Sequence, residues 1–350
     1  MGRKLIVVCG ATGNQGGSVA RRFLRDPGFQ VRGLTRDTSS EKSRELVELG
    51  VEMVQADVED AASLEAGFRG ANLIFSVTQY WEPFFRPDYV AAAKEQGVSI
   101  RKLAYDVEYR CGRNIADAAA AAALDSLDEN GFLVSTLSHA ARCSGGRYTD
   151  LYHFDAKADI FPDYVEKTYP ELAKRMSCIQ TGYFFTSYNI LPNSYFAKQQ
   201  GEGFKMQFPT DPTKQQPHLD VNGDMGNFVY AVHQMPAGKA YMAEGTTCTW
   251  PDFLETWRKA TGVRHATYEQ VPQATMVAAS SGGYEDLGQE VARMFAYSSD
   301  PGYDGGMELL RAEDLRKAGI DCPMTSWEDW ASRHDWSAIL NSNVAAWRAA

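Results

Sequence analysis

The feature that most constrains the fold is a glycine-rich segment, residues 10–16, that directly follows an apolar run near the start of the chain. The run over residues 5–9, Leu-Ile-Val-Val-Cys, predicts a buried strand, and residues 18–24 carry apolar side chains at helical spacing. A strand, a glycine turn and a helix in this order are typical of a dinucleotide-binding site. Glycine is needed there because a side chain would block the turn and the approach of a pyrophosphate to the helix N-terminus.

The glycines are spaced G-x-x-G-x-x-G rather than the commoner G-x-G-x-x-G, and a purely structural turn is the alternative interpretation. The place of the segment between a predicted strand and a predicted helix favours cofactor binding. The residues predicted to contact the cofactor here are Gly10, Thr12, Gly13, Asn14, Gln15 and Gly16.

The end of the second predicted strand, residues 30–34, bears on which dinucleotide is bound. An acidic side chain there accepts a hydrogen bond from the 2′-hydroxyl of NAD, whereas an arginine pairs with the 2′-phosphate of NADP. Arg36 lies twenty residues after Gly16 and predicts NADP(H). The neighbouring Asp37 keeps NAD open, and a solvated surface arginine is the alternative for Arg36.

Strand and helix patterns alternate over the first half of the chain and predict a Rossmann-type, doubly wound parallel sheet of the α/β class. Ligands of such sheets lie beyond the carboxyl ends of the strands, so Asp57, Val58, Thr78 and Gln79 are expected at the cofactor. Asp57 could also cap the following helix. Further strands are predicted at 51–55, 72–77, 132–136 and 176–181, and helices at 41–49, 61–68, 113–127 and from 152 towards 169.

After residue 182 the pattern is less regular. We predict an NADP(H)-binding domain over residues 1–182 and a smaller, interleaved C-terminal α/β lobe for substrate or partner over 183–350, with residues 218–243 returning to the first domain. In this half, strands are predicted at 203–208, 218–221 and 239–243, helices at 225–234, 250–260, 287–297, 312–318 and 326–332, and loops at 280–283 and 298–306.

Composition excludes several classes of function. A net charge of −10 and a pI near 5.2 argue against a general affinity for nucleic acid or an anionic membrane. No apolar stretch approaches the ~20 residues of a membrane span, and no signal peptide is recognised, so we expect a cytoplasmic protein. The six cysteines form no CxxC pair and predict neither a metal site nor disulfides. Whether the protein is a homo-oligomer is left open.

Four separated segments resemble the NmrA-like family, an atypical branch of the short-chain dehydrogenase/reductase superfamily that contains both oxidoreductases and NADP(H)-sensing regulators. They are residues 10–20 (GATGNQGGSVA), 34–37 (LTRD), 77–82 (VTQYWE) and 153–157 (HFDAK). The resemblance extends to about residue 330, and residues beyond 335 look like an unshared tail. It implies a dinucleotide on the glycine loop, Arg36 at the adenosine phosphate and Lys157 near the nicotinamide ribose. It also implies that the nicotinamide is flanked by Thr181, Gly182, Tyr183 and Phe184.

The proton donor of the superfamily is missing. Its members place a tyrosine four residues before a lysine, whose charge lowers the pKa of the phenol. Here the residue four before Lys157 is His153, and Tyr152 would point about a hundred degrees away on a helix. A charged His153 could donate a proton, although Lys157 would lower the pKa of its imidazole. The alternative is that His153 only orders the loop or caps the helix.

Three further residues have candidate roles. Ser138 stands where a serine would hold a substrate carbonyl, although a serine at a strand end is often only a turn residue. Tyr183 could line a substrate pocket with the aromatic residues 80 and 81, or belong to the core. Lys157 is expected to contact the cofactor, with a solvated helix face as its alternative.

Three functions from different classes follow. The first is an NADPH-dependent oxidoreductase of secondary metabolism that reduces a small imine, enone or activated carbonyl, which the aromatic residues near 80 and 183 favour. The second is a regulator that binds NADP(H) without turnover and acts through a protein partner, which the missing tyrosine favours. The third is a non-redox use of the pocket, such as isomerisation. The first is preferred.

Overall fold

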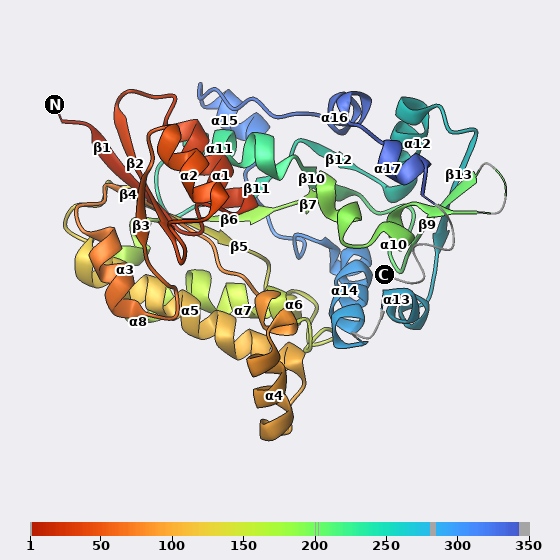
Figure 1. Ribbon diagram of the computed structural model, residues 1–350, viewed down its shortest axis with the longest axis horizontal. Coiled ribbons are helices and arrows are strands. Elements are labelled where there is room, and N and C mark those ends of the chain that lie inside the picture. Colours follow the sequence, from red (N-terminus) through yellow and green to blue (C-terminus); the bar gives the residue numbers. More distant parts are fainter. Residues whose placement is uncertain (1, 200, 202, 281–284, 343–350) are drawn as a thin grey trace.

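The glycine-rich segment follows an interior strand of a seven-stranded sheet in the computed structural model, which describes residues 2–199, 201, 203–280 and 285–342 (Figure 1). Every neighbouring pair of strands is parallel, and the order is β11-β6-β5-β4-β1-β2-β3. The order confirms the predicted Rossmann-type sheet. Its strands are β1 (Lys4–Val8), β2 (Phe29–Thr35), β3 (Glu52–Gln55), β4 (Leu73–Ser76), β5 (Phe132–Thr136), β6 (Met176–Thr181) and β11 (Ala240–Ala243).

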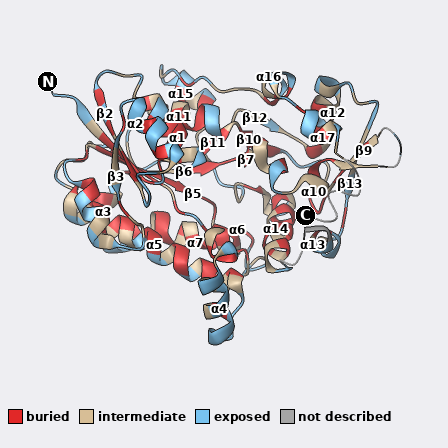
Figure 2. Cartoon of the chain, in the orientation of Figure 1, coloured by how far each residue is buried: buried red, intermediate tan, exposed pale blue. Residues whose placement is uncertain are grey.

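Helices cover both faces of the sheet because successive side chains of each strand point to opposite sides. Ile6 and Val8 enter one hydrophobic core, whereas Val7 and Cys9 enter the other. The buried sides of the helices face the sheet in both layers (Figure 2). The first layer holds α1 (Asn14–Phe23), α2 (Glu41–Glu48), α11 (Val221–Val232) and α15 (Ala312–Lys317), and the second α3 (Ala61–Phe68), α5 (Ile100–Ala122), α7 (Tyr152–Ala158), α8 (Val165–Thr168) and α9 (Pro170–Ala173).

The second lobe contains two three-stranded sheets, β12-β10-β7 and β13-β9-β8, around an aromatic core. Trp250, Trp257 and Trp327 are fully buried in this core. Its strands are β7 (Tyr183–Phe184), β8 (Ala197–Lys198), β9 (Gly203–Phe208), β10 (Gln216–Leu219), β12 (Thr246–Cys248) and β13 (His265–Gln270). Its helices are α10 (Pro192–Tyr195), α12 (Trp250–Thr261), α13 (Gln273–Ser280), α14 (Glu285–Tyr297), α16 (Trp327–Arg333) and α17 (Ser337–Leu340), with a short 3₁₀ turn η3 (Phe185–Asn189).

Several predicted boundaries were wrong. The helix expected at 113–127 is α5, which starts at Ile100 because the Ser99 hydroxyl accepts a hydrogen bond from the Lys102 amide, 3.2 Å away. The helix expected from 152 to 169 ends after α7 and resumes at α8, because Phe161, which precedes a proline, has φ −125° and ψ 104°. The intervening turn is η2 (Asp159–Tyr164), α6 (Ala140–Cys143) follows β5, and η1 (Glu82–Phe85) and α4 (Pro87–Gln96) precede α5.

In the second half, α11 begins four residues earlier than expected because Asp220 accepts a hydrogen bond from the Gly223 amide at 3.2 Å. The loop expected at 298–306 begins with a helical turn, η4 (Ser298–Gly302). Of the loop expected at 280–283, residue 280 ends α13 and the rest lies outside the described residues.

Late segments of the chain join the first sheet. The strand β11 pairs with β6, and α11 packs so closely on α1 that the Gly226 amide donates to Ser18 Oγ at 2.9 Å. Residues 312–322 pack on the same layer, which the sequence did not predict. Of the expected tail, Trp336 and Ile339 are buried in the aromatic core, and residues 343–350 lie outside the described part of the chain.

Among the described helices, none is long and apolar enough to cross a bilayer. All six cysteines are free, and Cys9 is buried in the sheet. Within the described residues, no group of three His, Cys, Asp or Glu side chains is arranged to hold a metal ion.

Candidate functional site

The glycine loop forms a cradle at the carboxyl end of β1. Gly10 has φ +61°, and a Cβ on Gly16 would overlap the Gly10 carbonyl, lying 2.7 Å from its carbon. The helix α1 then begins with Gly13 as its N-cap, so no side chain caps its first amides. A helix start left open in this way suits a phosphate. Gln15 Oε1 is buried without a hydrogen-bonding partner in the described chain, and as an acceptor it could bind a hydroxyl of a ligand but not a phosphate oxygen.

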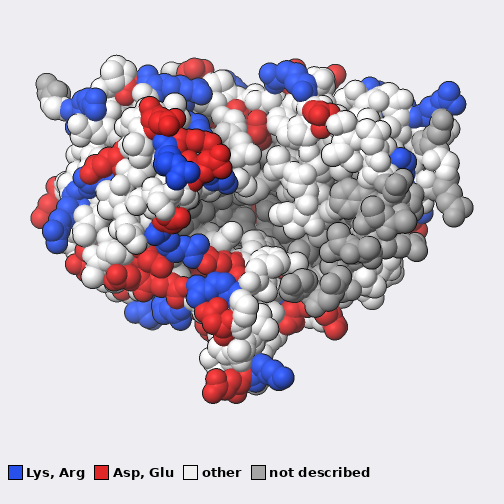
Figure 3. Space-filling model, viewed as in Figure 1, with Lys and Arg blue, Asp and Glu red and all other residues white. Residues whose placement is uncertain are grey.

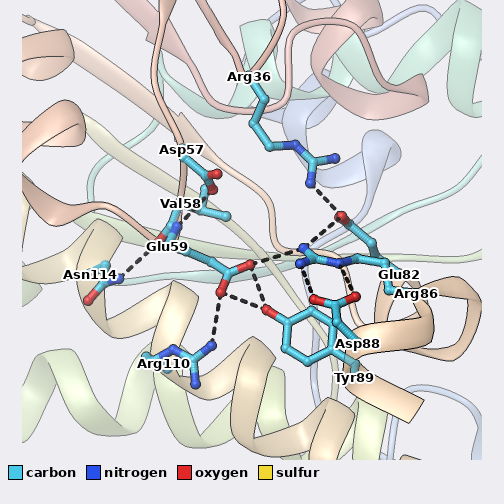
Figure 4. Close-up of polar contacts among 10 residues, drawn as sticks. All are labelled: Arg36, Asp57, Val58, Glu59, Glu82, Arg86, Asp88, Tyr89, Arg110 and Asn114. Carbon is cyan, nitrogen blue, oxygen red and sulfur yellow. Dashed lines mark hydrogen bonds and ion pairs between the residues drawn. The ribbon is translucent and has the colours of Figure 1, made fainter. Parts of the chain in front are cut away.

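Charged side chains gather beside this loop, around the end of β2 (Figure 4). Arg36 forms an ion pair with Glu82 of η1, and the guanidinium of Arg86 lies 3.7 Å from the same Glu82 oxygen. Arg86 also pairs with Asp88 at 2.6 Å and with Glu59 at 3.5 Å. In the space-filling view, acidic and basic side chains lie along one side of a hollow in this face of the molecule (Figure 3).

Asp57 and Val58 belong to the turn after β3. The Asp57 carboxylate accepts from the Glu59 amide at 3.0 Å, and the Val58 carbonyl accepts from Asn114 at 2.9 Å. The cap of α3 is Asp60, which accepts from two helical amides, so the alternative role of Asp57 as that cap was wrong. Asp57 and Val58 lie in the cluster of Figure 4, close to Arg36.

Lys157 lies in a buried cluster at the carboxyl end of β4. Its Nζ donates to Thr78 Oγ1 at 3.1 Å and to the Thr78 carbonyl at 3.3 Å, and it forms an ion pair with Glu108 of α5. Thr78 Oγ1 in turn donates to Glu108 at 2.7 Å. The Lys157 side chain is only 14% exposed, which excludes a solvated helix face. The other Glu108 oxygen, Oε2, is buried and has no partner in the described chain.

His153 lies one helical turn before Lys157 and is held by the second lobe. Its Nδ1 is 2.7 Å from Glu290 Oε1 of α14, and its backbone amide donates to the same oxygen at 2.9 Å. Glu290 Oε2 accepts from Arg101 Nε at 2.8 Å. Because a carboxylate only accepts, His153 carries a proton on Nδ1. The ring also packs on Trp81, with centroids 4.9 Å apart.

Ser138 and Tyr183 have partners in the second lobe. The Ser138 hydroxyl lies 2.9 Å from the Tyr297 hydroxyl, and the Tyr183 hydroxyl lies 2.6 Å from Ser298 Oγ. Both side chains are buried, and burial raises the pKa of Tyr183 well above its ordinary value. Their catalytic roles stay predictions.

The other predicted cofactor residues lie at neighbouring strand ends. Gln79 is exposed beside buried Thr78. Gly182 lies tightly against β10, since a Cβ there would be 2.6 Å from the Pro217 backbone. Phe184 is half-buried on β7, which pairs with β10.

A second histidine flanks α7. His139 Nδ1 and Nε2 lie 3.1 Å from Asp155 and Asp159 respectively. Burial alone would lower the pKa of His139, but the hydrogen bonds to the two carboxylates outweigh it and raise the pKa to about 9. The imidazolium therefore ties α6 to α7 at neutral pH.

Arg36, Asp57 and Val58 lie together in Figure 4, and Lys157 contacts Thr78 at the carboxyl end of β4. Ser138 and Tyr183 are instead bound to Tyr297 and Ser298 of the second lobe. Sequence reasoning missed Arg86, Glu108 and Glu290, and it included Glu82 only as the last residue of the 77–82 segment, without a role of its own. Of these residues, only Glu82 had a local sequence signal, because it is the charged residue of the 77–82 segment.

Comparison with known proteins places the fold and the motifs in one family. The model of the NmrA-like family matches residues 2–331. The chain is 42% identical to the NmrA-like oxidoreductase hkm9 of Aspergillus hancockii over 34% of this chain and 31% of that relative. It is 27% identical to the NmrA-like oxidoreductase ptmS of Penicillium ochrochloron over 85% of this chain and 84% of that one. The structure of NmrA, a negative transcriptional regulator in complex with NADP, superposes with a TM-score of 0.66 at 19% identity over 95% of both chains.

Proposed function

The chain belongs to the NmrA-like family, and on that basis we propose that it is an NADPH-dependent oxidoreductase that reduces a small C=N, C=C or C=O substrate. The observation that carries the proposal is the glycine cradle. Its backbone leaves no room for a side chain at Gly16 and presents the uncapped start of α1 at the carboxyl end of β1. Relatives described as oxidoreductases support turnover rather than binding alone.

The described residues fit the dinucleotide. The amides at residues 13–16 would hold the pyrophosphate, Arg36 the adenosine 2′-phosphate, and Asp57 and Val58 the adenine. Lys157 would hold the nicotinamide ribose, with Nζ shared between Thr78, Glu108 and the ribose hydroxyls. When bound, the cofactor supplies a hydride.

The chain itself would supply the proton. Glu290 fixes His153 with its proton on Nδ1, so that Nε2 is the ring nitrogen left to act on a substrate. A proton donated from Nε2 would have to come from the doubly protonated ring, whose Nδ1 proton stays on Glu290, and Arg101 holds that carboxylate in place. Trp81 and Tyr80 pack on the His153 ring and exclude water from that side.

A second candidate is a regulator that binds NADP(H) without turnover and acts through a protein partner. The hydroxyls of Ser138 and Tyr183 favour it, because both are tied to second-lobe residues rather than offered to a substrate. NmrA, described as a transcriptional regulator, shares the fold.

Turnover separates the two candidates. Purified protein mixed with NADPH and a panel of imines, enones, quinones and aldehydes should consume absorbance at the nicotinamide band with at least one compound. The Lys157→Ala variant should abolish this activity, because it removes the cation that contacts Thr78 and Glu108 where the ribose is proposed to bind. Cofactor binding with no consumption across the panel would refute the oxidoreductase and leave the regulator.

Cofactor choice tests the site independently. Arg36→Ala should weaken NADPH about 10–100-fold, the typical contribution of a charge-assisted hydrogen bond, and should change NADH far less. Arg44→Ala is the matched control, since Arg44 lies nearby on α2 and bonds the Ser39 carbonyl. Equal losses for both cofactors in the Arg36 variant would contradict the 2′-phosphate assignment.

A further inference from the structure

Arg36, the residue expected to meet the 2′-phosphate, already has an anionic partner. Its guanidinium forms an ion pair with Glu82 Oε1, which is its hydrogen-bonding partner within the described chain. The hydrogen bond to Glu82 raises the pKa of Arg36 above its ordinary value. Glu82 comes from η1, which follows β4, so it reaches Arg36 from a different segment of the sheet edge (Figure 4).

A second guanidinium converges on the same oxygen. Arg86 lies 3.7 Å from Glu82 Oε1, one helical turn later in the chain. Unlike Arg36, it has independent anchors, since it makes two hydrogen bonds to Asp88 at 3.2 and 2.6 Å and contacts Glu59 at 3.5 Å. Arg86 would therefore keep its place if Glu82 moved away.

Two guanidinium groups around one oxyanion form the arrangement that a phosphate monoester takes between arginines. The Glu82 carboxylate occupies the centre of that arrangement. Its side chain is 31% exposed and that of Arg36 is 56% exposed, so the pair is hydrated and weak enough for a doubly charged phosphate to displace. A carboxylate beside the adenosine ribose is also the group that accepts a hydrogen bond from the 2′-hydroxyl of NAD.

We propose that Glu82 sets the choice between NADP(H) and NAD(H), by competing with the 2′-phosphate for Arg36 and Arg86 and by accepting the 2′-hydroxyl of NAD in its place. The inference rests on the proposed dinucleotide site and adds Arg86 as a second phosphate ligand. With Glu82 in place, the site would accept both cofactors. The ratio of its affinities for NADP(H) and NAD(H) would be smaller than in a site where Arg36 had no carboxylate partner.

The test is calorimetric titration of NADP⁺ and NAD⁺ into the full chain and its variants. Glu82→Gln keeps the shape of the side chain and removes its charge. This variant should bind NADP⁺ about fivefold more tightly, which is the scale of one exposed ion pair, and should bind NAD⁺ about threefold more weakly. Arg86→Ala should weaken NADP⁺ about fivefold and leave NAD⁺ within about twofold.

Asp106→Asn is the control, because it also removes one negative charge from a surface ion pair, but from a carboxylate that pairs with Lys102 rather than with Arg36 or Arg86. It should shift both cofactors by less than about twofold. If Glu82→Gln changes both affinities equally, or leaves them unchanged while the wild type binds both cofactors, the role of Glu82 is refuted and the proposed function stands. If the wild type binds neither cofactor, both proposals are refuted.

Discussion

The buried contact between the lobes gives the sharpest stability prediction. Glu290→Ala removes the carboxylate that joins His153 and Arg101, whose side chains are 5% and 8% exposed. Removing one partner of a buried ion pair typically costs about 3–5 kcal/mol, because the other charge is left without compensation. Arg101 keeps a weak contact with Asp150 at 3.5 Å and one with Gln289 at 3.3 Å, so we expect about 3 kcal/mol, the lower end of that range.

Urea denaturation followed by circular dichroism measures this loss as a lower midpoint at an unchanged slope. Glu313→Ala is the control, since Glu313 is 70% exposed and pairs with Lys317 on the surface. It should cost less than about 0.5 kcal/mol. A loss below about 1 kcal/mol for Glu290→Ala would show that Arg101 and His153 do not depend on this carboxylate.

Two further predictions concern the glycine loop and His139. Gly16→Ala should weaken the binding of NADP⁺ about tenfold or more, because its methyl group would overlap the Gly10 carbonyl and overpacking typically costs about 1–3 kcal/mol. Gly2→Ala is the control, since a Cβ added there meets nothing within 4 Å, and it should have no effect in the same titration. The raised pKa of His139, about 9, should contribute stability that is complete below pH ~6.5 and lost as the pH rises through 9. His139→Gln should therefore unfold more easily than wild type at pH 6 by up to about 3 kcal/mol, and a difference that persists unchanged at pH 10 would contradict the assignment.

The sheet was predictable because its signals are local. The interior strands β1, β4 and β5 are short apolar runs, and the turn after β1 demands glycine within seven residues of sequence. The same reasoning found Arg36 and Lys157, which lie at fixed offsets from those signals. It also located α12, which Thr249 caps and Gly262 ends with φ 71°.

The contacts that complete the site are long-range, and no local pattern reports them. Glu108 meets Thr78 across 30 residues, and Glu290 meets Arg101 across 189. The start of α5 is different, because its signal is local: Ser99 caps the helix, and we did not use this cap to predict where the helix begins. The first turns of α5 carry charged residues, which are usually exposed, but Arg101 and Glu108 are buried against partners on other elements.

The central claim, that the glycine cradle and Arg36 hold NADP(H), is tested most directly by a crystal structure of the protein with NADP⁺. The account predicts the pyrophosphate at hydrogen-bonding distance from the amides of residues 13–16 and the 2′-phosphate on Arg36, with Glu82 moved off that guanidinium. A dinucleotide bound elsewhere, or a pyrophosphate that does not contact the start of α1, would contradict it.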